Sequence, residues 1–130
     1  QGLHFMKFRI KPGASILDAV KLGYCLNYPE RRVMGNRATP PLISCDTDQV
    51  IIETVKLAED GSGDLIVRLY ESIGSRAQCN IKLDISYRTV RRCSLLEEPL
   101  DFEVEKNNSS ISIDFRPFQL ITLRFSGLKQ

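Results

Sequence analysis

Hydrophobic and polar residues alternate over most of the second half of the chain, and this alternation predicts β-strands. Residues 79–85, 111–115 and 121–125 each place an apolar side chain at every second position. A period of two puts the apolar side chains on one face of a sheet and the polar ones on the other. Shorter apolar runs predict further strands at residues 42–45, 50–58, 65–71, 89–96 and around Phe102 and Val104. The segments EDGSGD at 59–64 and KNNSS at 106–110 predict hairpin turns.

The first forty residues have a less regular pattern. Leu3, Phe5 and Met6 lie among polar residues and predict an opening strand that runs to Lys11. Pro12 and Gly13 then break the chain, and Ser15 with Asp18 forms the sequence pattern of a helix N-cap, so we expect a short helix that ends near Gly23. Residues 27–41 contain three prolines, a glycine and three arginines, and they predict a long loop.

These elements together predict an all-β protein, an antiparallel β-sandwich of about eight to nine strands with one short helix. The length of 130 residues suits a single domain covering residues 1–130. The chain begins at Gln1 and enters a strand pattern by Leu3, without an initiator methionine or a signal peptide. We therefore expect a fragment of a longer protein.

Charge and hydropathy exclude two classes of partner. Eighteen basic and sixteen acidic residues give a net charge of +2, with both signs interspersed, which is too small an excess to predict binding to nucleic acid. No apolar run approaches the roughly 18 residues needed to cross a bilayer, so we expect no membrane partner.

The cysteines bear on the redox setting of the protein. Cys25, Cys45, Cys79 and Cys93 are far apart, have no CxxC spacing and sit in apolar runs. A thiol in such a run usually acts as a small buried hydrophobe, so we expect four reduced and buried cysteines; disulfides or a metal site are the alternatives. Reduced cysteines favour a cytoplasmic protein.

Few residues of the chain could carry catalysis. His4 is the single histidine, and in a strand pattern it is more often a structural residue than a catalytic base. Glu71, Glu97 and Glu98 are candidate carboxylates for a glycosidase, which needs a pair of them. The simpler interpretation is that Glu71 and Glu97 end strands and form ion pairs with Arg68, Arg91 or Arg92 across the sheet.

Four motifs in order resemble one known family. They are His4 and Phe5 at the start of a strand, the L-N-x-P of Leu26, Asn27 and Pro29, IVRLYES at 66–72 followed by Gly74, and SLLEE at 94–98 with RPFQLITLRF at 116–125. This series resembles the C-terminal β-domain of the glycoside hydrolase family 38 α-mannosidases of the cytosolic type. The resemblance covers nearly the whole chain.

The resemblance implies that the parent protein hydrolyses terminal α-mannosides with retention and with the help of zinc. In the family the catalytic aspartates and the zinc lie in an N-terminal domain, so it implies no catalytic residue, no metal site and no cofactor in this chain. The partner would be the rest of the α-mannosidase, which would bind the oligosaccharide. The motif residues would be architectural, with Leu69, Leu95, Leu96, Phe118 and Leu123 at positions of strands that face the core fully or in part.

The loop at 27–41 is the best candidate for a contact with another domain or with the rim of a substrate site. Loops of this length in compact domains are often functional, and guanidinium groups bind carboxylates and carbonyls through forked donors. The candidate residues are Asn27, Tyr28, Arg31, Arg32, Asn36 and Arg37.

Two other functions stay open at this stage. One is a carbohydrate-binding module, which the absence of tryptophan and the scattering of Tyr24, Tyr28, Tyr70 and Tyr87 disfavour. The other is an oligomerisation module, possible for a sandwich with an apolar or arginine-rich face, and it would make the protein a homo-oligomer.

Overall fold

The computed structural model describes residues 2–28, 30–104, 106–107 and 110–129. The contacts within the chain divide it into two units, Gln1–Ala38 and Thr39–Gln130. All nine strands of the described structure lie in the second unit.

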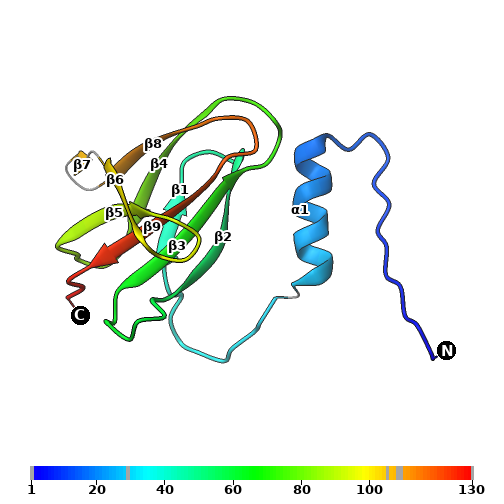
Figure 1. Ribbon diagram of the computed structural model, residues 1–130. Coiled ribbons are helices and arrows are strands. Elements are labelled where there is room, and N and C mark those ends of the chain that lie inside the picture. The colour runs from blue at the N-terminus through cyan, green and yellow to red at the C-terminus, as the bar shows by residue number, and fades with distance from the viewer. Residues whose placement is uncertain (1, 29, 105, 108–109, 130) are drawn as a thin grey trace. The chain divides into compact units, whose positions relative to one another are not determined.

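The second unit is a sandwich of two antiparallel sheets, as the alternation predicts (Figure 1). The first sheet has the strand order β1-β4-β8-β7, with bounds Ile43–Cys45, Ala77–Leu83, Ser110–Phe115 and Lys106–Asn107. The second has the order β2-β3-β9-β5-β6, with bounds Val50–Leu57, Leu65–Glu71, Leu120–Ser126, Thr89–Cys93 and Pro99–Glu103. The fold class and the number of strands expected from the sequence are therefore confirmed.

The hydrophobic core lies between the facing surfaces of the two sheets. Alternate residues of β3, β9, β4 and β8 supply it; they include Leu65, Val67, Leu69, Ile121, Leu123, Phe125, Cys79, Ile81, Ile111, Ile113 and Phe115. The edge of the Tyr87 ring packs on Phe125, with the ring centroids 5.0 Å apart. Burial of these side chains supplies the main free energy that holds the sheets together.

The hairpin turn at 59–64 has the geometry expected of it. Gly61 and Gly63 both have positive φ, 71° and 80°, a conformation that costs glycine little. Arg124 of β9 crosses to this turn and forms ion pairs with Asp60 at 2.6 Å and with Asp64 at 2.7 Å. The turn is thus held to the neighbouring strand of the sheet. The other predicted turn lies partly at Asn108 and Ser109, outside the described residues.

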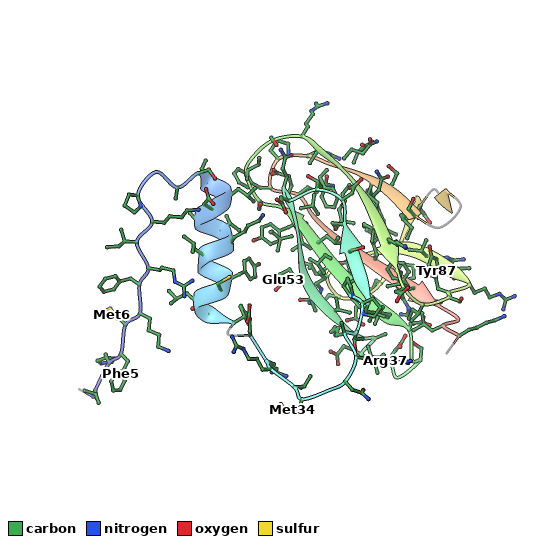
Figure 2. All side chains as sticks on the ribbon, turned by 180° about the vertical axis from the view of Figure 1, so that it is seen from behind. Phe5, Met6, Met34, Arg37, Glu53 and Tyr87 are labelled. Carbon is green, nitrogen blue, oxygen red and sulfur yellow. The ribbon has the colours of Figure 1, made fainter. Side chains whose placement is uncertain are left out.

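The first unit differs from the sequence-based prediction. Residues 2–10 form no strand in the described structure, and Phe5 and Met6 project from an extended segment with 84% and 88% of their surface exposed (Figure 2). The prediction of an opening strand to Lys11 was therefore wrong. An alternating pattern forms a stable strand only where a partner strand accepts its backbone hydrogen bonds.

The predicted helix exists but is longer than expected. It is α1, Ile16–Asn27, and Ser15 and Asp18 form the predicted capping box. The helix continues through Gly23, because an interior glycine costs only about 1 kcal/mol. It ends where the Tyr28 N–H donates to the carbonyl of Tyr24 at 2.8 Å. No described helix is long and apolar enough to span a bilayer.

Candidate functional site

Glu71, the last residue of β3, binds two loops through its buried carboxylate. Its side chain is fully buried. One oxygen accepts hydrogen bonds from the backbone N–H groups of Gly74 at 2.8 Å and Phe118 at 2.9 Å. The other accepts from the N–H of Ile73 at 3.0 Å and from the Ser75 hydroxyl at 3.4 Å. Glu71 thus ties the loop after β3 to the loop before β9.

These hydrogen bonds keep Glu71 charged inside the protein. Burial by itself raises the pKa of this carboxyl group, but the hydrogen bonds from Phe118, Ile73, Ser75 and Gly74 together outweigh it and lower the pKa below its ordinary value. Backbone N–H donors stabilise the ionised form of a carboxylate because they replace the water that it loses on burial. The expected ion pair of Glu71 with an arginine across the sheet is replaced by this set of donors.

Residues 116–119 form a tight turn that depends on the same glutamate. The Gln119 N–H donates to the carbonyl of Arg116 at 3.0 Å, and Phe118 has a φ of 56°. A β-turn with proline second and a positive φ third is of type II, and it normally has glycine at the third position. The Phe118 ring lies against Gly74, where an added Cβ would be only 2.6 Å from the ring. The hydrogen bond to Glu71 therefore holds the strained backbone of Phe118, and the contact with Gly74 holds its ring.

Glu97 has a comparable role in the β5–β6 hairpin. It also has a positive φ, 66°, and it closes a turn in which its N–H donates to the carbonyl of Ser94 at 3.0 Å. Its carboxylate is buried against Lys56 at 2.7 Å and Arg68 at 3.8 Å, and it accepts the N–H of Glu59 at 2.9 Å. The ion pair with Lys56 and the hydrogen bond from Glu59 hold the pKa of Glu97 below its ordinary value.

The two turns expose apolar side chains that come from the family-like motifs. Leu95, Leu96 and Phe118 are 59%, 82% and 71% exposed. We call these three residues the motif surface. The prediction that they face the core was wrong, although it holds for Leu69 and Leu123, which are fully buried. The turns hold these side chains outside the sheet, and the alternation pattern of a strand does not apply to a turn.

Arg68, which forms an ion pair with Glu97 of the β5–β6 hairpin, also holds the backbone of the motif surface. Arg68 donates from its guanidinium to the carbonyl of Leu95 at 3.0 Å. This contact and the ion pair with Glu97 come from the same side chain. Buried polar side chains therefore hold the loop that carries the exposed leucines, and the periodicity of the sequence does not predict these contacts.

One feature of the sequence does indicate a buried carboxylate that binds a loop. It is an acidic residue at the end of an apolar strand with a glycine three positions later, as in Glu71 and Gly74.

The candidate catalytic carboxylates do not form a glycosidase pair of free groups. Glu71 and Glu97 are each engaged as described, and Glu98 is exposed beside Glu97 at the hairpin. His4 is exposed in the extended segment of the first unit. No three histidine, cysteine or carboxylate side chains of the described residues gather as metal ligands.

The candidate contact residues of the loop lie at the end of α1 and in the stretch that follows it. Asn27 is the last residue of α1, and its side-chain amide donates to the carbonyl of Gly23 at 2.9 Å. Tyr28 is 73% exposed and stacks on Tyr24, with ring centroids 6.0 Å apart. The remaining candidates, Arg31, Arg32, Asn36 and Arg37, are exposed in the stretch that has neither helix nor strand, where Figure 2 labels Arg37. Pro29 lies outside the described residues.

The cysteines are free thiols in the structure, but they differ in burial. Cys79 and Cys93 are buried, Cys45 is half-buried and Cys25 is exposed on α1. The expectation of burial was therefore wrong for Cys25, since α1 has no buried residue. A hydrogen bond with the Cys45 thiol and burial raise the pKa of Cys79, and burial raises that of Cys93.

Comparison with known proteins finds one matching family and several related chains. The family described as the glycosyl hydrolases family 38 C-terminal beta sandwich domain matches residues 49–123. The chain is 29% identical over 132 residues to alpha-mannosidase 2C1 of Homo sapiens, and 30% identical over 138 residues to alpha-mannosidase G of Dictyostelium discoideum. It is 25% identical over 149 residues to an alpha-mannosidase of Saccharomyces cerevisiae.

These alignments cover almost all of this chain and a small part of each relative. They include 94%, 95% and 95% of this chain but only 13%, 12% and 14% of the respective relatives. The chain therefore spans about an eighth of the length of the curated relatives that it matches. The matched family region runs from just before β2 into β9 and contains both Glu71 and Glu97.

Proposed function

The chain belongs to the glycosyl hydrolase family 38 C-terminal β-sandwich domains, and from this premise we propose that it is a non-catalytic domain that supports the catalytic part of an α-mannosidase. The parent enzyme would hydrolyse terminal α-mannosides with retention, and we place it in the cytoplasm. The partner of this domain is the remainder of the parent chain.

The observation that carries the proposal is the motif surface. Leu95, Leu96 and Phe118 are apolar, exposed and held in place by strained turns. A non-glycine residue at positive φ costs of order 1 kcal/mol or more, and such strain persists where the conformation serves a function. A protein that docks on these side chains would gain the free energy of covering them, about 25 cal/mol for each Å² of apolar surface.

The proposed occupant of the motif surface is the rest of the α-mannosidase chain. The relatives are several times longer than this chain, and the alignments with them cover nearly all of this chain. Contacts between domains of one chain resemble protein interfaces, in which a few exposed apolar side chains supply most of the binding free energy.

The non-catalytic role is supported by the state of the carboxylates. A retaining glycosidase needs a nucleophile and an acid about 5 Å apart with access to the sugar. Glu71 is fully buried, and its oxygens accept four hydrogen bonds from the protein, so it has no open position for a substrate. Zinc does not fit the described residues, since these bring no set of ligands together, and we assign the metal and the reaction to the rest of the parent enzyme.

The proposal is tested by comparing variants in the full-length enzyme and in the isolated chain. We expect Leu95→Ser with Leu96→Ser to lower the Tm of the full-length enzyme by several degrees, because the interface loses apolar contacts. The Tm of the isolated 130-residue chain should stay within about 2 degrees, because both side chains are exposed there.

The matched control is Leu57→Ser, which removes an exposed leucine at the end of β2 outside the motif surface. It should leave both proteins unchanged. Equal Tm values for the wild-type and doubly substituted full-length enzymes would contradict the proposed docking role.

A further inference from the structure

A second feature of the sandwich is a concave surface rich in arginine. It has a volume of about 730 Å³ and draws its lining from both sheets. The polar lining residues are Arg76, Gln78, Arg92, Asp114, Arg116 and Gln119, and we call this the arginine pocket. Its volume lies within the roughly 300–1,000 Å³ that is usual for pockets that bind small molecules.

The arginine pocket has an excess of positive charge. Three guanidinium groups and one carboxylate line it, so its formal charge is three minus one, or +2. Two arginines of the second sheet outside the pocket have acidic partners: Arg68 has Glu97, and Arg124 has Asp60 and Asp64. The side chains of Arg76 and Arg116 have no ion pair among the residues that the structure describes.

The wall of the pocket is held in place before any ligand binds. Arg116 and Gln119 begin and end the turn that Glu71 holds through the Phe118 N–H, 2.9 Å from its carboxylate. The side-chain oxygen of Gln119 accepts the backbone N–H of Arg116 at 2.9 Å, which leaves the Gln119 NH₂ group to donate. A site that is ordered in advance loses less entropy when it binds a ligand.

We propose that the arginine pocket binds a small phosphomonoester dianion. Guanidinium groups bind phosphate oxygens through two parallel hydrogen bonds, and several of them neutralise a charge of about −2. The amide groups of Gln78 and Gln119 offer donors to hydroxyl groups next to the phosphate, as in a phosphorylated sugar. The pocket adjoins the turn that carries Phe118, but Leu95, Leu96 and Phe118 do not line it, and phosphate binding is measured without the rest of the parent enzyme, so the two proposals can fail independently.

Calorimetric titration of the 130-residue chain tests the proposal with three probes: inorganic phosphate, mannose 6-phosphate and mannose. We expect saturable binding of both phosphates in the millimolar range or tighter, and no binding of mannose up to about 10 mM. Tighter binding of mannose 6-phosphate than of phosphate would identify a sugar phosphate as the ligand class. Equal affinities would identify the phosphate group alone, and both results support a phosphate site.

The decisive variant is Arg76→Gln with Arg116→Gln, which should weaken phosphate binding by about tenfold or more through the loss of charge-assisted hydrogen bonds. The control is Arg91→Gln, since Arg91 is exposed on β5 next to Arg92 but does not line the pocket. It should change the affinity less than about twofold. A thermal melt verifies that each variant is folded. No saturation by either phosphate, or equal losses in the double variant and the control, would overturn the proposal.

Discussion

At the scale of single residues, Glu71 is the charged side chain that joins the loop after β3 to the loop before β9. It is a buried carboxylate that accepts hydrogen bonds from three backbone N–H groups and one hydroxyl, and these donors come from two loops. Phe118 is 47 positions away along the chain, so the contact depends on the pairing of β3 with β9. A charged group can be stable in such a place because the protein donors replace its hydration.

We therefore expect Glu71→Ala to destabilise the isolated chain by about 3 kcal/mol or more, since buried N–H groups lose their acceptor. Glu71→Gln should cost less, because the amide oxygen still accepts some of the hydrogen bonds. Urea denaturation at pH 7 measures both. A loss below about 1 kcal/mol for Glu71→Ala would show that water replaces the carboxylate easily.

The cysteines give a second prediction at this scale. Labelling of the folded chain with a thiol reagent should modify Cys25 first and Cys45 more slowly, while Cys79 and Cys93 react only on unfolding. The raised pKa values of Cys79 and Cys93 reduce their thiolate fraction further. Mass spectrometry of the peptides gives the order. A count of four thiols is expected under denaturing, non-reducing conditions, and a count of two or zero would indicate disulfides.

At the scale of elements, the turns are more informative than the strands. Phe118 and Glu97 are the non-glycine residues with positive φ in the described structure. Glu97 lies in the turn between β5 and β6, and Phe118 lies in the turn between β8 and β9. A glycine would fit either position without strain. Each side chain has a specific partner instead, Gly74 for Phe118 and Lys56 for Glu97.

The stretch from α1 to β1 carries the arginine candidates, and its role stays a prediction. In the full-length enzyme, replacing Arg31, Arg32 and Arg37 together by alanine should lower the Tm or raise KM, because forked donors to another domain or to the substrate rim are lost. The isolated chain should melt as before, since these side chains are exposed. Differential scanning fluorimetry and steady-state kinetics measure the two effects. A triple variant equal to the wild type in both would make the stretch a plain connector.

At the scale of the whole molecule, the carboxylates determine how stability depends on pH. The pKa values of Glu71, Glu97, Asp46 and Asp64 lie below their ordinary values, and that of Asp60 is lowered to about 2. The causes are hydrogen bonds and ion pairs that favour the ionised form, acting against burial. At pH values between the lowered pKa values and the ordinary ones, the unfolded chain binds more protons than the folded one, so the free energy of unfolding rises with pH.

The expected outcome is a free energy of unfolding that is steady between about pH 7 and 5 and falls steeply from about pH 4.5 toward pH 2. Denaturant titrations at intervals of one pH unit check this, and Glu71→Gln should make the fall shallower. A stability that stays constant down to pH 3 would show that these carboxylates have the same pKa values in the folded and unfolded states.

Much of the fold follows from local pattern. The alternation of apolar residues predicts β4, β8 and β9, the run at 65–71 is β3, and Ser15 with Asp18 starts α1. These predictions hold because a strand with one buried face needs an apolar residue at every second position, and a cap needs a side-chain acceptor at a fixed spacing. The same alternation predicted a strand at residues 3–11, where the described structure offers no partner strand.

The sequence by itself determined the class of fold, the order of the strands along the chain and the family. The tertiary structure decided the partners of the charged residues: Glu71 binds backbone N–H groups instead of an arginine, and Arg76, Arg92 and Arg116 come together in one pocket. It also decided that Leu95, Leu96 and Phe118 face solvent. The physical reason is range, because periodicity depends on neighbours a few positions apart, whereas these contacts join loops that only sheet pairing brings together.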